Sequence, residues 1–164
     1  MKMNSIITLL ILTGVTSSFF TLKAQHMGTM VPDHTMIMPM DIKWGDAPPG
    51  LPPGSQAALI AGNPAAPSGT FTIRAKMPAN YRIMPHFHPA DEHVTVIEGK
   101  CYMGMGDKFD EKTATLLPTG AFAVMNAGSH HYFFTKEPCI IQVHGMVPWG
   151  ITYINPADDP RGEK

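Results

Sequence analysis

The distribution of proline and glycine constrains the fold of this chain more than any other feature of its sequence. The 164 residues include 16 prolines and 15 glycines. Beyond Pro32, the longest stretch without proline covers residues 90–117, and it contains Gly99, Gly104 and Gly106. Proline removes a helical hydrogen bond and clashes with the preceding turn, so there is room for only one or two short helices. An all-α architecture is therefore excluded.

Residues 1–24 have the pattern of a secretory signal peptide. Lys2 gives a positive start, an apolar run begins at Ile6, and small and polar residues lead to Ala24. This pattern predicts cleavage after Ala24 and a periplasmic or secreted location. A transmembrane anchor is the alternative, but the apolar run is short for a span of ~20 residues and is interrupted by Thr, Gly and Ser. We therefore expect an exported chain with no stable membrane anchor.

The charge balance excludes several classes of protein. The chain has 12 basic and 13 acidic residues, which gives a net charge of −1, and 44% of its residues are hydrophobic. A nucleic-acid-binding protein would show a basic patch, so we expect no nucleic-acid partner. A disordered chain would be strongly charged and poor in apolar residues. The length and composition predict one folded domain.

From Gly69 onward the sequence is typical of short β-strands. Phe71, Ile73, Ala75 and Met77 alternate with polar residues, and this period of two indicates a half-buried strand. Gly, Pro, Asn and Asp separate further apolar runs roughly every ten residues, which is typical of an all-β barrel or sandwich. A single-domain Greek-key or jelly-roll barrel suits such a chain, because these architectures leave few unpaired strand edges. Further strands are expected at residues 81–88, 92–98, 101–105, 114–117, 121–125, 131–135, 139–144 and 151–154.

The chain divides into four expected parts. The signal peptide covers residues 1–24, an extended arm with a lead-in strand at 57–61 covers 25–68, the barrel covers 69–155, and a C-terminal tail covers 156–164. Residues 107–112 are the one expected helical turn.

The start of the arm is rich in methionine. It holds His26, His34 and methionines at positions 27, 30, 36, 38 and 40. Methionine adapts to irregular apolar surfaces, so we expect this segment to pack against the barrel. The alternative is a copper-binding role, because thioether and imidazole groups suit soft copper ions.

Four residues form a candidate metal site. His86 and His88 are two positions apart on an expected strand, so their side chains point to the same face. Pro89 turns the chain after them, which allows the carboxylate of Glu92 to return to the same place. His131, after the turn at Gly128, is the candidate fourth ligand. Imidazoles with a carboxylate form a set that suits a divalent metal ion.

The run His86-Phe-His88, followed by Glu92 after three residues and Gly99 after six more, resembles the first motif of the cupin superfamily. The run from Gly120 to His131 resembles the second cupin motif. The resemblance covers about residues 69–154 and implies a conical β-barrel, a cupin jelly roll, with a metal inside. It assigns His86, His88, Glu92 and His131 as the metal ligands.

The sequence departs from the cupin pattern at three positions that are not ligands. Asn80 replaces a glycine before the first motif, and asparagine tolerates the left-handed turn nearly as well. Asn126 replaces the proline of the second motif, and Thr135 replaces its asparagine. For the ligands themselves, His130 is an alternative to His131 and Asp91 to Glu92, but the motif spacing favours His131 and Glu92.

Other side chains are candidates for the substrate pocket or for a disulfide. Met84, Phe133, Gln142 and His144 are candidate pocket residues, and Gln142 or His144 could hydrogen-bond a ligand, as metal sites commonly need, whereas the alternative for His144 is a histidine satisfied within the core. Cys101 and Cys139 either form a disulfide, as an oxidising compartment allows, or are two small buried thiols.

A cupin with this ligand set implies a metal-dependent enzyme. The ion is Fe, Mn, Ni, Cu or Zn, and affinity order alone does not choose among them. We expect an oxidoreductase of dioxygenase type that acts on a small organic molecule, with Glu92 as a ligand and a candidate proton acceptor. The alternatives are a non-catalytic binding or sensing cupin and a sugar or keto-acid isomerase. The resemblance also implies a homodimer.

Overall fold

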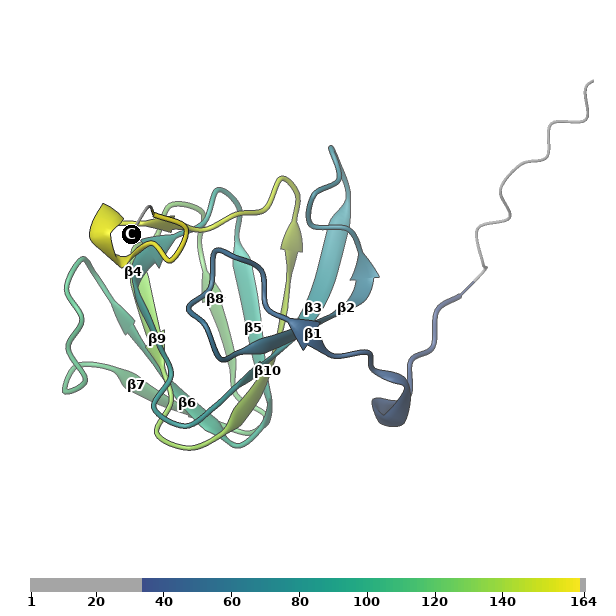
Figure 1. Ribbon diagram of the computed structural model, residues 1–164, viewed down its shortest axis with the longest axis horizontal. Coiled ribbons are helices and arrows are strands. Elements are labelled where there is room, and N and C mark those ends of the chain that lie inside the picture. The colour runs from purple at the N-terminus through teal and green to yellow at the C-terminus, as the bar shows by residue number, and fades with distance from the viewer. Residues whose placement is uncertain (1–33, 163–164) are drawn as a thin grey trace, which may run out of the picture. The chain divides into compact units, whose positions relative to one another are not determined.

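The computed structural model describes residues 34–162 of the chain (Figure 1). The expected signal peptide, His26, Met27 and Met30 lie outside the described residues. No helix among the described residues is long and apolar enough to cross a membrane.

Within residues 34–162 the chain forms eleven β-strands and two short 3-10 helices. The helices are η1 (Pro39–Asp41) and η2 (Pro156–Asp158). The strands are β1 (Gly45–Asp46), β2 (Gln56–Gly62), β3 (Thr70–Met77), β4 (Arg82–Phe87), β5 (Glu92–Glu98), β6 (Lys100–Met105), β7 (Thr115–Pro118), β8 (Phe122–Met125), β9 (His131–Phe134), β10 (Cys139–Met146) and β11 (Thr152–Tyr153).

The strands form two antiparallel sheets that face each other (Figure 1). One sheet has the order β1-β2-β3-β10-β5-β8 and the other has the order β11-β4-β9-β6-β7. Strands that are neighbours in a sheet are often distant in sequence, as where β10 lies between β3 and β5. This order is that of a jelly-roll barrel, and the prediction of an all-β fold is confirmed.

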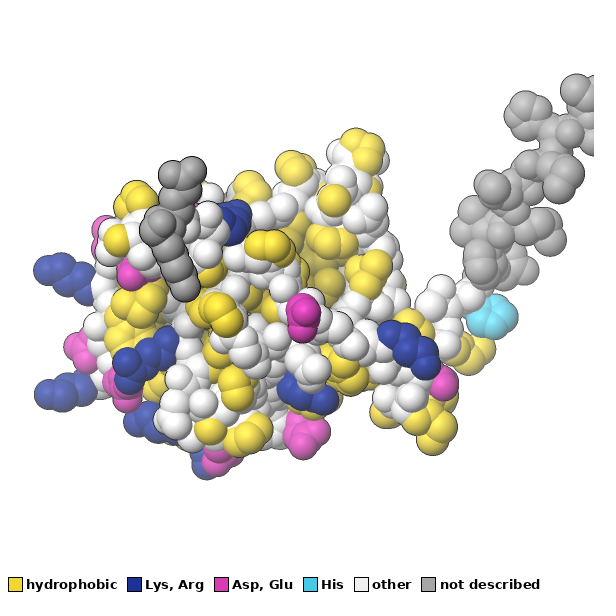
Figure 2. Space-filling model, in the orientation of Figure 1, with side chains coloured by type: hydrophobic (Ala, Val, Ile, Leu, Met, Phe, Trp, Pro, Cys, Tyr) yellow, Lys and Arg dark blue, Asp and Glu magenta, His cyan; other side chains and the backbone are white. Residues whose placement is uncertain are grey.

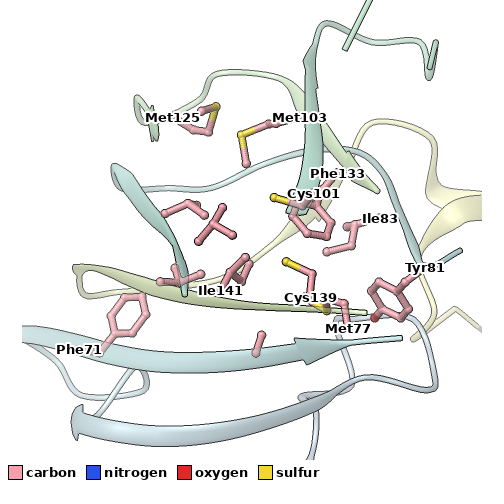
Figure 3. Packing of buried hydrophobic residues seen from close by; sticks show 14 of the residues in the cluster. Phe71, Met77, Tyr81, Ile83, Cys101, Met103, Met125, Phe133, Cys139 and Ile141 are labelled. Carbon is pink, nitrogen blue, oxygen red and sulfur yellow. The ribbon is translucent and has the colours of Figure 1, made fainter. Parts of the chain in front are cut away.

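The core fills the space between the sheets because apolar residues occupy every second position of the central strands. On β3, Phe71, Ala75 and Met77 are buried, and on β10, Ile141 and Val143 are buried (Figure 3). The alternate residues face outward: Arg74 on β3 donates a hydrogen bond to the side chain of Gln142 on β10, at 3.1 Å. The predicted period of two is thus the physical basis of the core.

Cys101 and Cys139 meet across this core (Figure 3). They lie on β6 and β10, one from each sheet, and both are fully buried free thiols. A hydrogen bond to Cys139, followed by burial, raises the pKa of the Cys101 thiol. The small-thiol interpretation describes the structure, and a disulfide under oxidising conditions stays a prediction.

Three local predictions have clear outcomes. Asn80 has a φ of 61°, so asparagine does adopt the left-handed turn expected of it. The lead-in strand is present as β2. The prediction of a helical turn at residues 107–112 is wrong, because the chain bends at the start of this segment and forms no helix. The carbonyl and side chain of Asp110 instead accept hydrogen bonds from Thr113 and Lys112, which closes a single turn.

The described methionines of the arm do not pack against the barrel. Met36, Met38 and Met40 are 74%, 51% and 88% exposed. The packing prediction is therefore wrong for these three, because η1, which ends at Asp41, buries none of its residues. Copper binding by the arm stays a prediction.

Candidate metal centre

The four predicted ligands meet at one end of the barrel because each lies at or next to a strand end. His86 is near the end of β4, and His88 follows β4 directly. Glu92 is the first residue of β5, and His131 is the first residue of β9. His131 is also the cross-strand partner of His86. All four residues are buried, each less than 10% exposed.

Backbone carbonyls fix the orientation of all three histidine rings. In each ring Nδ1 lies within hydrogen-bond distance of a carbonyl oxygen, which only accepts, so Nδ1 carries the proton and donates. The distances are 2.7 Å from His86 to Met84, 2.6 Å from His88 to Gly150 and 3.0 Å from His131 to Ser129. The Nε2 atom of each ring is therefore left with a free lone pair.

The ligand atoms converge on one small volume. The available ring nitrogens of His86, His88 and His131 all lie within 4.8 Å of one another. The Glu92 carboxylate completes the group, with Oε2 3.2 Å from Nε2 of His131 and Oε1 3.6 Å from Nε2 of His88. The sequence prediction thus selected four side chains that the structure brings together.

This arrangement fits a metal ion because it leaves buried nitrogen atoms without partners. Among the described residues, Nε2 of His88 and Nε2 of His131 are buried and make no hydrogen bond. The contact of His131 with Glu92 is close, but it lacks hydrogen-bond alignment. An unpaired buried polar atom is unfavourable, whereas a divalent ion would satisfy both nitrogens and the carboxylate together.

The protonation states also suit a metal ion. Burial, with help from His131 and His88, lowers the pKa of His86 from 6.5 to about 3. Burial also lowers the pKa of His88. For Glu92, burial acts to raise the pKa, but the contact with His131 and the neighbouring His88 outweigh it, so the pKa is lowered. Neutral imidazoles and an ionised carboxylate are the forms that bind a metal.

The segment after β10 holds His88 from two sides. The Trp149 ring stacks on His88, with ring centroids 4.3 Å apart and an angle of 11° between the planes. Another neighbour of this ring is Phe71, with ring centroids 4.9 Å apart. The next residue, Gly150, supplies the carbonyl that accepts from Nδ1 of His88. Such contacts behind a ligand fix its orientation and commonly tune metal affinity.

The site opens into a cavity of about 820 Å³. His86, His88 and Glu92 lie on its wall, together with apolar residues of the core strands such as Ile83 and Val143. Figure 2 shows a hollow with hydrophobic side chains on its wall beside the position of β2 and β3 in Figure 1. We call His86, His88, Glu92 and His131 together the ligand group. A small organic molecule in the cavity therefore has access to the ligand group.

The predicted pocket residues are not on the cavity wall. Gln142 and His144 alternate with the buried Ile141 and Val143 and so face outward, where His144 contacts His93 with ring centroids 4.7 Å apart. Phe133 belongs to the hydrophobic core, and Met84 packs against that core. These pocket predictions are wrong. The physical reason for Gln142 and His144 is the alternation of the strand, which places them on the outer face.

The two alternative residues, His130 and Asp91, make contacts elsewhere. The ring of His130 lies 2.6 Å from the Asp107 carboxylate, outside the ligand group, and is stacked on Phe87. Asp91 accepts a hydrogen bond from the backbone of Ala127 at 2.8 Å. Of each neighbouring pair, the residue that the motif spacing favours is the one that lies in the ligand group.

Sequence reasoning missed the residues that surround the ligands from distant parts of the chain. Trp149 and Gly150 position His88, and Pro48–Leu51, β2 and Arg161 line the cavity. Trp149 was open to prediction as a large aromatic residue beside a proline near the last strands. The carbonyl of Gly150 and the wall from the arm carry no local sequence signal.

Comparison with known proteins adds structural relatives only. No family model matches the sequence, and no curated protein does. Among solved structures, the polyketide cyclase RemF from Streptomyces resistomycificus aligns with a TM-score of 0.63 and 18% identity, covering 77% of this chain and 89% of that one. A candidate acetylacetone dioxygenase from Methylibium petroleiphilum aligns with a TM-score of 0.58 and 15% identity, covering 79% and 87%.

An RmlC-like cupin from Shewanella frigidimarina also aligns, with a TM-score of 0.53 and 12% identity, covering 69% of this chain and 90% of that one. At these identities the likeness shows the fold. The chain thus has the fold of the cupin superfamily, a double-stranded β-helix, as its sequence motifs predicted.

Proposed function

We propose that this protein is an exported metal-dependent oxidoreductase of the dioxygenase type that acts on a small organic molecule. The observation that carries the proposal is the convergence of three imidazoles and one carboxylate, three of these four residues lying on the wall of an open cavity. Three histidines and one glutamate would leave one or two positions of a six-coordinate ion for other ligands. Export rests on the sequence of residues 1–24.

His86, His88, His131 and Glu92 would hold the ion. A bound Fe(II) ion would supply Lewis-acid and one-electron chemistry, as it does in oxygenases that use histidine and carboxylate ligands. The backbone carbonyls of Met84, Gly150 and Ser129 hold Nδ1 of each ring, so Nε2 would be the atom available to the ion. Glu92 can accept a proton from a substrate bound in the cavity, because its carboxylate is ionised and on the cavity wall.

Two candidate functions from the sequence are less well supported. An isomerase for sugars or keto acids would use basic side chains near the metal to hold an anionic substrate. Arg74 and Lys76 face outward, where Arg74 bonds to Gln142 and Lys76 lies over the ring of Trp44. A binding or sensing cupin shares the metal site, and it is distinguished by the absence of turnover.

The first test is metal content. The purified protein is reconstituted in turn with Fe(II), Mn(II), Ni(II), Cu(II) and Zn(II), and about one equivalent per chain is expected for at least one of them. His86→Ala is expected to lose the metal. His93→Ala is the matched control, because His93 faces outward against His144. Less than about a tenth of an equivalent with every ion would contradict the metal site.

The second test is oxygen consumption by the Fe(II) form with a panel of diketones and flavonols. Uptake that needs both the substrate and His86 supports the oxidoreductase. Metal binding with no turnover toward any substrate supports the binding cupin instead. The homodimer stays a prediction, and the mass of the native protein in solution tests it.

A further inference from the structure

The cavity extends far beyond the four metal ligands. Its volume of about 820 Å³ is much larger than one ion and a diatomic gas need, and it falls in the range of sites for organic molecules of drug size. Its outer part, the outer chamber, is lined by Pro48–Leu51, Ala57–Leu59, Asn63–Ala65 and Arg161. These segments come from the arm and the C-terminal tail, not from the strands that carry the ligands.

The wall that β2 contributes is apolar and open. Ala57 and Leu59 pair with Ala75 and Ile73 of β3, and all four line the cavity. Leu59 is 56% exposed although it is a large hydrophobic residue. An exposed leucine at the wall of a cavity has the surface that an apolar ligand would cover.

The charged residues of the wall offer nothing to an anion. Among the described lining residues these are Asp46, Glu92 and Arg161. Arg161 is held by Asp159, with Nε 2.8 Å from Oδ1 and Nη2 2.7 Å from Oδ2, and Nη2 also donates to the carbonyl of Ile151. Its positive charge is thus already paired, and Asp46 adds a negative charge at the wall. A carboxylate or phosphate in the outer chamber would meet no free cation among the described residues that line it.

We propose that the outer chamber binds a neutral, largely apolar organic molecule, and that Leu59 determines this preference. The chamber would hold the apolar part of the molecule and direct its other end to the ligand group. That last step rests on the proposed function, whereas binding in the chamber itself does not need a metal.

Two fluorescent probes with the same ring skeleton test the charge preference. N-phenylnaphthylamine is neutral, and anilinonaphthalene sulfonate adds one sulfonate to it. Both are titrated against the wild-type protein as purified and against the same protein made metal-free with a chelator, which leaves the chamber unaltered. The neutral probe is expected to bind about tenfold more tightly than the sulfonate, in both forms, because the sulfonate has to give up hydration without gaining a cation.

A substitution at Leu59 tests the specificity residue. Leu59→Lys is expected to weaken the neutral probe about tenfold and to tighten the sulfonate. Leu116→Lys is the matched control, because Leu116 is 47% exposed on β7 and does not line the cavity. It should change neither affinity.

Three results would overturn the proposal: sulfonate binding as tight as that of the neutral probe, affinities that Leu59→Lys leaves unchanged, or no saturable binding of the neutral probe. Failure of the metal site has a different signature. In that case no ion binds, but the neutral probe still binds and still responds to Leu59→Lys.

Discussion

Acid should destabilise the metal-free protein through His86. In the unfolded chain the imidazole takes up a proton near pH 6.5, but in the folded protein burial lowers its pKa to about 3. Between these values the unfolded state binds more protons, so the free energy of unfolding falls as the pH falls. The stabilisation is fully present above pH 6.5 and is lost progressively down to about pH 3.

The size of the effect follows from the two pKa values of His86. Lowering the pH from 7 to 5 raises the average proton occupancy of the His86 imidazole in the unfolded chain by about 0.7, while the folded protein takes up almost none. The free energy of unfolding falls by about 2 kcal/mol as a result. His88 adds to this in the same direction, because its pKa is also lowered. The loss from Glu92 begins only as the pH falls toward 4.5, so measurements at pH 5 and above isolate the histidines.

Urea denaturation of the metal-free protein, with a chelator present, measures this loss at pH 7, 6 and 5. His86→Gln is expected to reduce the pH dependence by about 2 kcal/mol over that interval. His93→Gln is the matched control, because His93 lies on the outer face of the sheet, against His144. If wild type and His86→Gln have parallel pH profiles, the buried neutral state of His86 is refuted.

Two further predictions concern the neighbours of the site and the core. Trp149→Ala is expected to weaken zinc binding about tenfold, because it removes the ring that stacks on His88. Equal zinc affinities of wild type and Trp149→Ala in a calorimetric titration would contradict this. Trp44→Ala is the control. Cys101 and Cys139 are expected not to react with a thiol reagent in the folded, reduced protein and to react fully in denaturant, because both are buried. Rapid labelling under native conditions would contradict the packing of the two thiols.

The sequence was sufficient for the strands and for the first three candidate ligands because both are encoded by local spacing, whereas His131 joins them only through its pairing with His86 across the sheet. The alternation from Phe71 to Met77 sets which side of β3 enters the core. His86 and His88 share a face for the same reason, and the turn at Pro89 brings Glu92 back to them. Each of these features depends on a few neighbouring residues, so no knowledge of the rest of the chain was needed.

The cavity wall was not predictable in the same way. Leu59 and Arg161 reach the cavity only after β2 pairs with β3 and the tail folds back to Ile151, and the same cavity takes residues from distant strands, such as Ile83 and Val143. The error at Gln142 and His144 is of another kind. Their polar character suggested a pocket, but Ile141 and Val143 between them already marked the opposite face of β10 as the buried one.

The ligand group explains why this end of the barrel needs so many backbone contacts. Three imidazoles and a carboxylate are unfavourable in a protein interior unless their polar atoms have partners. The carbonyls of Met84, Gly150 and Ser129 satisfy one nitrogen of each ring and leave the other free. The fold therefore satisfies Nδ1 of each ring and leaves the buried Nε2 atoms of His88 and His131 without partners, so a bound ion would stabilise the protein by interactions that the chain cannot make alone.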